Sequence, residues 1–201
     1  MNPNNPELKI LLLVGGKSQR MGKDKAGLEY EGKTQLERMV SLVAPLDLET
    51  YLSVRKEQGS RDKTSITPIY DHIEFADIGP MGGMLSAFQE FPTSAFLVIA
   101  CDLPFLTIET LEHLINNRDG SQFASAYRSS NDGLPEPLCA IWEPASREVL
   151  KQKLSEGIRC PRKILIQGNL KLLDLPKADA LDNINTPEEY KEAQKKLSSA
   201  K

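Results

Sequence analysis

The segment from Ile10 to Leu36, ILLLVGGKSQRMGKDKAGLEYEGKTQL, decides how the rest of the chain is interpreted. Its apolar run, residues 10–14, is followed directly by Gly15 and Gly16. This pattern predicts a buried strand that ends in a tight loop. Because glycine has no Cβ, a bound molecule can approach the backbone N–H groups of such a loop closely.

Positive charge gathers directly after the glycine pair. Residues 17–25 contain a single acid, Asp24, and the cations Lys17, Arg20, Lys23 and Lys25. A bare backbone beside converging cations suits a chain of phosphates. The alternative that composition leaves open is a basic surface loop without a ligand.

Two common phosphate-binding fingerprints do not match this loop. The P-loop pattern requires a glycine five positions before Gly16, where the sequence has Leu11. The dinucleotide pattern G-x-G-x-x-G does not occur in the sequence. The loop therefore belongs to neither of these two classes.

Length and composition limit the possible classes of protein. A chain of 201 residues with 40% apolar content fits one globular domain, spanning 1–201, with a full core. A net charge of −3 leaves no basic excess for binding nucleic acid. Its cysteines lack C-x-x-C spacing and are odd in number, which argues against a disulfide framework or a zinc knuckle: Cys101, Cys139 and Cys160.

The N-terminal residues do not resemble a targeting segment. The start MNPNNPE has no basic region and no long apolar region, and we expect residues 1–7 to be flexible. No apolar run reaches the ~18 residues that a membrane span needs. The sequence therefore predicts a cytoplasmic location and no membrane contact.

Apolar patterning in the first half alternates between strands and helices. It predicts strands at 10–14, 50–54, 66–70 and 95–100, and helices at 34–43, 83–91 and 107–117. The strand at 95–100 lacks polar alternation, as expected of a strand covered on both faces. This order predicts an α/β fold: a Rossmann-like three-layer sandwich with a mostly parallel sheet and helices on both faces.

The second half has weaker signals. Helices are predicted at 144–156 and 161–167, and strands at 123–127, 137–142 and 170–175. Pro137 favours an edge strand or a bulged start for the strand that it opens. The last helix is marked by Thr186, Pro187 and Glu189, which supply a cap, a first-turn proline and a capping-box acid. No linker or repeat indicates a second domain.

Ligands of open α/β sheets bind beyond the carboxyl ends of the strands. Gly15, Asp71 and Asp102 each follow a predicted strand directly, so we expect them at one edge. Asp102 leaves a buried strand and is followed by Pro104, and one such carboxylate suits Mg²⁺ when a triphosphate supplies further oxygens. The alternative for Asp102 is a helix cap or a loop acid.

The run Leu13 to Leu28, LVGGKSQRMGKDKAGL, resembles the signature loop of NTP-dependent nucleotidyltransferases, above all the molybdenum cofactor guanylyltransferases, which join GMP to molybdopterin. Residues 101–106, CDLPFL, are similar to the metal-binding segment of these enzymes. The resemblance implies a fold of the nucleotide-diphospho-sugar transferase type. It also implies Mg²⁺ as the cofactor, held by Asp102.

The same resemblance assigns roles to individual residues. Arg20, Lys25 and Asp102 would be catalytic, whereas Lys17 and Lys23 are interpreted as solvated charges. GTP would be bound by Leu13, Val14, Gly15, Gly16, Lys25, Asp71, Gly79 and Asp102. Gly16 and the turn of Gly79, Pro80 and Gly83 resemble the guanine-selective form, and Asp77 is a rival of Asp71.

The acceptor end is less clearly marked. Asn183 and Asn185, in the run DNINTP, resemble the segment that helps to hold the pterin, but asparagine before a capped helix is also ordinary turn chemistry. Glu136 receives no role, because an acid beside an anionic pterin phosphate is unfavourable.

The predicted function is Mg²⁺-dependent transfer of GMP from GTP to the phosphate of molybdopterin, which gives molybdopterin guanine dinucleotide and pyrophosphate. The expected partners are these two substrates and molybdoenzyme maturation proteins. One alternative is a cytidylyltransferase for molybdopterin, or an enzyme for another small phosphorylated acceptor. An alternative of another class is a non-catalytic GTP-binding or assembly module.

Overall fold

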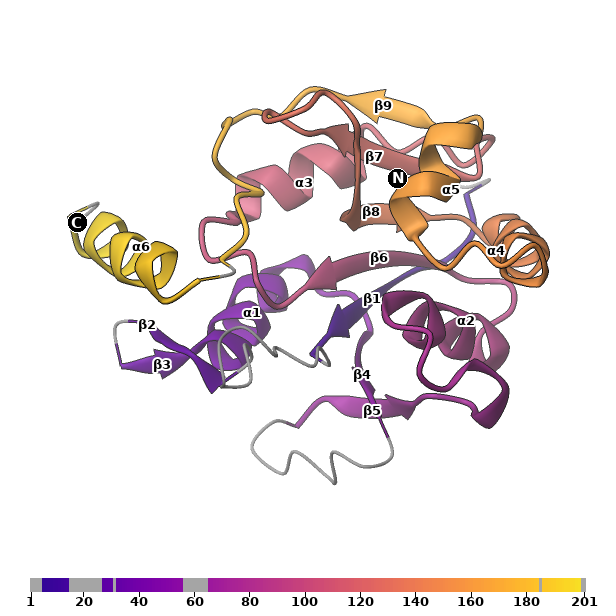
Figure 1. Ribbon diagram of the computed structural model, residues 1–201, viewed down its shortest axis with the longest axis horizontal. Helices are drawn as coiled ribbons and strands as arrows, with labels where there is room; N and C mark the ends of the chain where they lie inside the picture. The colour runs from indigo at the N-terminus through magenta and orange to yellow at the C-terminus, as the bar shows by residue number, and fades with distance from the viewer. Residues whose placement is uncertain (1–4, 15–26, 31, 56–64, 185, 200–201) are drawn as a thin grey trace.

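The structure is a computed structural model, and it describes residues 5–14, 27–30, 32–55, 65–184 and 186–199 (Figure 1). Its centre is a seven-stranded sheet in which only β8 runs against its neighbours. The mostly parallel sheet predicted from the sequence is therefore confirmed. In spatial order its strands are β5 (Thr67–Tyr70), β4 (Thr50–Val54), β1 (Leu8–Leu13), β6 (Ala95–Ala100), β8 (Pro135–Trp142), β7 (Ala124–Arg128) and β9 (Lys171–Leu173).

Helices cover both faces of this sheet, which confirms the three-layer prediction. Consecutive residues of β6 point to opposite faces, so Leu97 and Val98 belong to different core clusters. One face carries α1 (Gln35–Val43) and α3 (Ile108–Asn116). The other carries α2 (Pro80–Glu90), α4 (Ser146–Ser155) and α5 (Pro161–Gln167).

The strand β8 corrects one prediction and confirms another. It lies between β6 and β7 inside the sheet, so its placement at an edge was wrong. Its bulged start is confirmed, because the register shifts between the pairs Ala126–Ala140 and Arg128–Pro135. Pro137 falls within this shift, where the backbone hydrogen bonds between the strands are interrupted. The missing N–H of proline therefore costs no hydrogen bond there. The carbonyl of Pro137 instead accepts a hydrogen bond from Trp142 Nε1 at 3.1 Å.

The first turn of α2 lies earlier than the sequence predicted. The helix begins at Pro80 rather than at Gly83, and Gly79 precedes it with a φ of 69°. Proline suits the first helical position because its φ is already helical and its missing N–H has no partner there. Glycine adopts the positive φ before it without steric cost. The short helices η2 (Ala44–Leu46) and η4 (Ile73–Phe75) lie in the connections.

A small hairpin and the last helix pack together outside the main sheet. The hairpin consists of β2 (Glu29–Tyr30) and β3 (Lys33–Thr34), and α6 (Pro187–Ser199) lies beside it on the side to which β6 points (Figure 1). Tyr190 donates its hydroxyl to the carbonyl of Glu29, and its ring meets the Tyr30 ring edge-on with centroids 5.1 Å apart. The predicted cap of α6 is confirmed, since Glu189 N donates to Thr186 Oγ1 at 3.2 Å.

Two buried cations, Lys9 and Arg118, make ion pairs near the opposite ends of the strands, Lys9 with exposed carboxylates and Arg118 with a buried one. Lys9 of β1 is 4% exposed, and its Nζ lies 2.5 Å from a carboxylate oxygen of Glu49 and 3.0 Å from one of Glu7. Arg118 holds Glu143 through two hydrogen bonds of 2.6 and 2.7 Å. Of the segment predicted to be flexible, residues 1–4 lie outside the described part.

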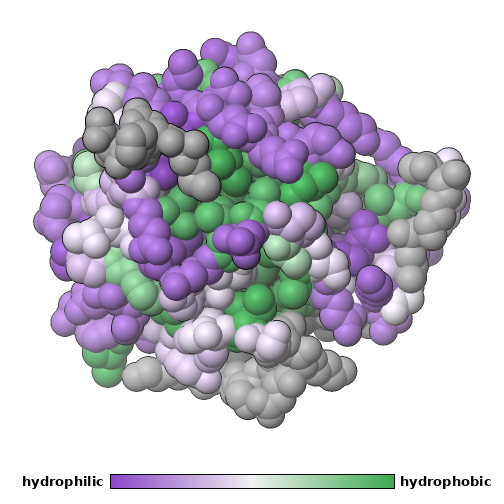
Figure 2. Space-filling model, turned by 180° about the vertical axis from the view of Figure 1, so that it is seen from behind, coloured by the Kyte–Doolittle hydropathy of each residue, from purple (hydrophilic) through white to green (hydrophobic). Residues whose placement is uncertain are grey.

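The surface has both polar and apolar regions. Seen from behind, apolar residues gather near the centre of the face and hydrophilic residues surround them (Figure 2). Exposed apolar area of this kind is common on folded proteins and does not by itself indicate a site. Among the described residues, no helix combines the length and the apolar character that crossing a membrane requires. The three cysteines are free thiols.

Candidate functional site

The carboxyl ends of the parallel strands meet at one edge because their residues are in register. Leu13, the last residue of β1, pairs with Ser53 of β4 on one side and with Ala100 of β6 on the other. Ser53 in turn pairs with Ile69 of β5. The carbonyl of Leu13 also accepts a hydrogen bond from the N–H of Cys101 at 3.2 Å. The residues that follow these strands therefore leave the sheet together.

Three of the predicted nucleotide-binding residues stand at this edge. Val14 follows β1 and is buried, Asp71 follows β5, and Asp102 lies two residues beyond β6. The N–H of Asp71 donates to the carbonyl of Val54 at 3.0 Å, which continues the pairing of β5 with β4. The rival Asp77 has a φ of 59° and lies after η4, just before Gly79.

Asp102 and Asn183 are brought together although they are far apart in sequence. The backbone N–H of Ile184 donates to the carbonyl of Asp102 at 3.2 Å. Both Asp102 and Asn183 line a pocket with a volume of about 390 Å³, which we call the strand-end pocket. Pro80, in the first turn of α2, lines the same pocket. Residues from the glycine–proline turn, the strand end and the pre-helix segment thus meet around one cavity.

The other walls of the strand-end pocket come from elements to which the sequence gave no role in the site. They are the bulged start of β8 and the first turn of α5 with the residues before it. The apolar part of the lining includes Leu103, Leu138 and Leu181. The charged part consists of Asp102, Glu136, Arg159 and Arg162. The sequence could have indicated Arg159 and Arg162 as site residues, because both lie in the run GIRCPR at 157–162, next to a predicted helix start.

Glu136 is paired with a cation inside this wall. Arg162 donates from Nη2 to Oε1 of Glu136 at 2.6 Å and from Nη1 to Oδ2 of Asp132 at 2.9 Å. Burial acts to lower the pKa of the Arg162 guanidinium, but its hydrogen bond and charge interaction with Glu136 outweigh this and raise the pKa. Burial, with a smaller effect of the Glu136 charge, raises the pKa of the Cys139 thiol to about 12. Cys139 is therefore a neutral thiol in the pocket lining.

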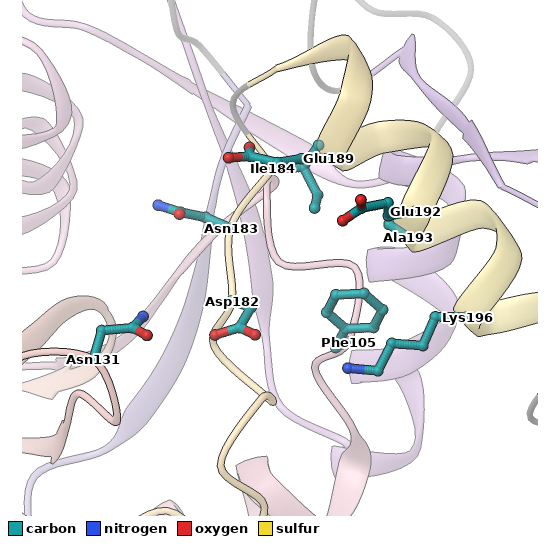
Figure 3. Close-up of a pocket in the computed structure, with 9 residues that line it drawn as sticks. All are labelled: Phe105, Asn131, Asp182, Asn183, Ile184, Glu189, Glu192, Ala193 and Lys196. Atoms are coloured by element: carbon teal, nitrogen blue, oxygen red, sulfur yellow. The ribbon is translucent and has the colours of Figure 1, made fainter.

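A second pocket of about 380 Å³ adjoins the first, and Asn183 lines both. Figure 3 shows that the side chain of Asn183 points away from α6, while Glu192 and Lys196 project from that helix. Nζ of Lys196 lies 4.5 Å from the centre of the Phe105 ring. The segment before α6 therefore separates two cavities.

The loop after Asp102 is supported by α1 and by the hairpin. Arg38 donates to the carbonyl of Pro104 at 3.4 Å, and its guanidinium carbon lies 5.5 Å from the centre of the Tyr30 ring. Burial raises the pKa of Tyr30 to about 12, and the charges of Tyr190 and Asp102 add to this rise. Tyr30 is therefore a neutral phenol near the Asp102 carboxylate.

Several predicted site residues lie outside the described residues: Gly15, Gly16, Arg20, Lys25 and Asn185. Within the described part of the chain, no group of three or more His, Cys, Asp or Glu side chains is arranged to hold a metal. A site for Mg²⁺ does not require such a group, because one or two carboxylates suffice when phosphate and water oxygens complete the coordination. The position of Asp102 beside a pocket at the strand ends fits this requirement.

Comparison with known proteins gives consistent matches. Residues 10–171 match the model of the MobA-like NTP transferase domain. A molybdenum cofactor biosynthesis bifunctional protein of Synechocystis is 34% identical over 90% of this chain, although the chain spans only 52% of that relative. A molybdenum cofactor guanylyltransferase of Pseudomonas putida is 26% identical, with 91% of this chain and 95% of the relative covered.

Solved structures agree with these matches. The molybdopterin-guanine dinucleotide biosynthesis protein A of Archaeoglobus fulgidus superposes with a TM-score of 0.80 at 26% identity, covering 95% of this chain and 99% of that one. A nucleotidyl transferase of Methanothermobacter thermautotroptrophicus has a TM-score of 0.77 at 17% identity, covering 97% and 99%, and shows the fold alone. The sheet order and the match over residues 10–171 together show that this nucleotidyltransferase belongs to the MobA-like NTP transferase family.

Proposed function

We propose that this enzyme transfers GMP from GTP to the phosphate of molybdopterin and releases pyrophosphate. The observation that carries the proposal is the meeting of Asp102 and Asn183 in one pocket at the carboxyl edge of the sheet. Asp102, which suits a metal–triphosphate complex, then lies beside the segment of Asn183, which resembles the pterin-holding region of the family. The names of the relatives support this choice of nucleotide and pathway.

The chemistry requires positioning and charge neutralisation. A phosphate oxygen of the acceptor attacks the α-phosphorus of GTP, a new P–O bond forms, and the bond to the pyrophosphate leaving group breaks. The attacking phosphate is already anionic, so no general base is needed. Arg20 and Lys25 hold the triphosphate and neutralise the charge that develops on it. Mg²⁺, held by Asp102, would supply further neutralisation when bound.

A pyrophosphate-release assay tests this proposal. The protein is incubated with Mg²⁺ and molybdopterin, and GTP, CTP, ATP and UTP are supplied one at a time. We expect release with GTP only. Release with CTP alone would identify a cytidylyltransferase, and tight binding of GTP without release would identify a non-catalytic module. Omitting Mg²⁺, with EDTA present, should stop release and leave the protein folded.

A further inference from the structure

The strand-end pocket combines apolar walls with the Glu136 carboxylate, which Arg162 orients on the side wall formed by β8 and α5. Leu103, Leu138 and Leu181 line it together with Glu136, whose side chain is only 20% exposed. Binding sites for planar heterocycles are mostly apolar, and a few placed polar groups fix the orientation of the ring. A partly buried carboxylate in such a wall requires hydrogen-bond donors, because burying an unpaired charge is costly.

Arg162 satisfies only part of this requirement. It donates to Oε1 of Glu136 at 2.6 Å and is itself held by Asp132. Within the part of the chain that the structure describes, Oε2 of Glu136 accepts no hydrogen bond. An ionised carboxylate has about four lone-pair positions on its two oxygens. Glu136 is therefore fixed in place with acceptor capacity remaining.

The donor set that fits this carboxylate is a ring N–H beside an amino group. The 2-amino-4-oxo ring of a pterin presents its N3–H and its 2-amino group side by side, so both can donate to one carboxylate. A phosphate dianion has no such donors. The remaining acceptor capacity of Glu136 therefore suits the ring end of an acceptor, whereas its phosphate end must lie toward Asp102 for the reaction to occur.

We propose that Glu136 is a specificity-determining residue that binds the amino and ring N–H groups of the acceptor heterocycle, and that Arg162 positions its carboxylate. This inference rests on the proposed function, since it names the residue that recognises the pterin ring. It also explains why an acid is tolerated here, because Arg162 compensates its charge. Among the described residues, Arg162 is the cation that forms an ion pair with Glu136.

Direct binding of a ring fragment tests this without turnover. Pterin is titrated with the protein and its fluorescence is followed, and lumazine, in which oxygen replaces the 2-amino group, serves as the matched ligand. We expect the wild-type protein to prefer pterin by on the order of tenfold. Glu136→Gln preserves the shape of the side chain and removes its charge, and it should reduce this preference to less than about twofold.

Two further variants separate recognition from folding. Arg162→Met should weaken pterin binding about as much as Glu136→Gln, and Arg162→Lys should restore part of it, because the positive charge returns without the forked geometry. Glu148→Gln, at an acid on α4 whose side chain is 75% exposed, is the control and should bind pterin like the wild type. An unchanged pterin preference in Glu136→Gln would overturn the proposal.

Kinetics distinguish failure of this inference from failure of the proposed function. If wild-type protein releases pyrophosphate from GTP and molybdopterin, Glu136→Gln should raise KM for molybdopterin about tenfold or more and leave KM for GTP within about twofold. If wild-type protein does not release pyrophosphate with any NTP, the proposed function fails. Pterin selectivity by the fragment assay would then still decide the role of Glu136.

Discussion

The N–H of Ile184 donates to the carbonyl of Asp102 at 3.2 Å, which joins the segment before α6 to the end of a central strand. This contact is made by the backbone, so it does not depend on the side chain at either position. A substitution at Asp102 should therefore change the side-chain charge at the carboxyl edge of the sheet and leave the segment that carries Asn183 in place. Mutational tests of this site can consequently separate loss of the carboxylate from loss of the fold.

Asp102→Asn should reduce turnover by at least roughly 10²-fold, because the amide has no charge with which to hold Mg²⁺. Affinity for GTP measured without metal should change little. Pyrophosphate release and calorimetric titration of GTP measure the two effects, and Asp174→Asn, at an acid whose side chain is 89% exposed, is the control. An active Asp102→Asn enzyme would exclude this residue as the metal ligand.

Lys25→Ala should lower kcat by roughly 10²–10³-fold, as expected when a charge contact to the developing transition state is lost. Lys23→Ala is the matched control from the same basic run, since Lys23 is interpreted as a solvated charge. It should retain activity within about twofold. Comparable losses in the two variants would show that the loop acts through its overall charge and not through one lysine.

Arg118→Met should destabilise the protein by about 3–5 kcal/mol, because it leaves the Glu143 carboxylate buried without its partner. The Glu143 side chain is only 1% exposed, and it accepts both hydrogen bonds from Arg118. Urea unfolding measures the effect. The double variant Arg118→Met, Glu143→Leu should recover much of the loss, because no unpaired charge remains. If the single variant were as stable as the wild type, this pair would not support the fold.

Glu49 makes the stability of the protein depend on pH. Its hydrogen bond with Lys9, then that with Tyr51, lowers the pKa of its carboxyl below the ordinary value for glutamate. A lowered folded-state pKa gives a contribution that is present above the unfolded pKa and is lost as the pH falls through the folded pKa. Glu49→Gln should therefore destabilise the protein at pH ~7 and lose most of this difference near pH ~3. Urea unfolding at both values measures it, and a difference independent of pH would contradict the assignment.

The sequence predicted the helices and parallel strands well because their signals are local. Thr186 was expected to cap the last helix, and it accepts the backbone hydrogen bond of a capping box, as Thr34 does at the start of α1. The register that places Asp71 and Asp102 at one edge also follows from a general rule for parallel sheets. Predicting these features requires only the identity of neighbouring residues and a common strand direction.

Features that depend on distant partners were not predicted. The interior position of β8 was not predicted, because Pro137 fits an edge strand as well as a bulged start, and only the register shift against β7 decides between them. The hairpin at 29–34 is too short to show alternation and is covered by α6 from the other end of the chain. Glu136 received no role, because an acid beside an anionic pterin phosphate is unfavourable and its pairing with Arg162 cannot be inferred from spacing. The roles of all the predicted site residues stay predictions, and Gly15, Gly16, Arg20, Lys25 and Asn185 lie outside the described residues.

The reversed direction of β8 has a consequence for how this enzyme could change its acceptor. The other strands of the sheet send their last residues toward the ligand edge, whereas β8 sends its first. The short turn at 129–134 leads into β8 at that end, and through Asp132 it holds Arg162 in the wall of the strand-end pocket. Under the proposed function, changes in this one turn would alter the acceptor side while the residues proposed to bind the nucleotide stay the same.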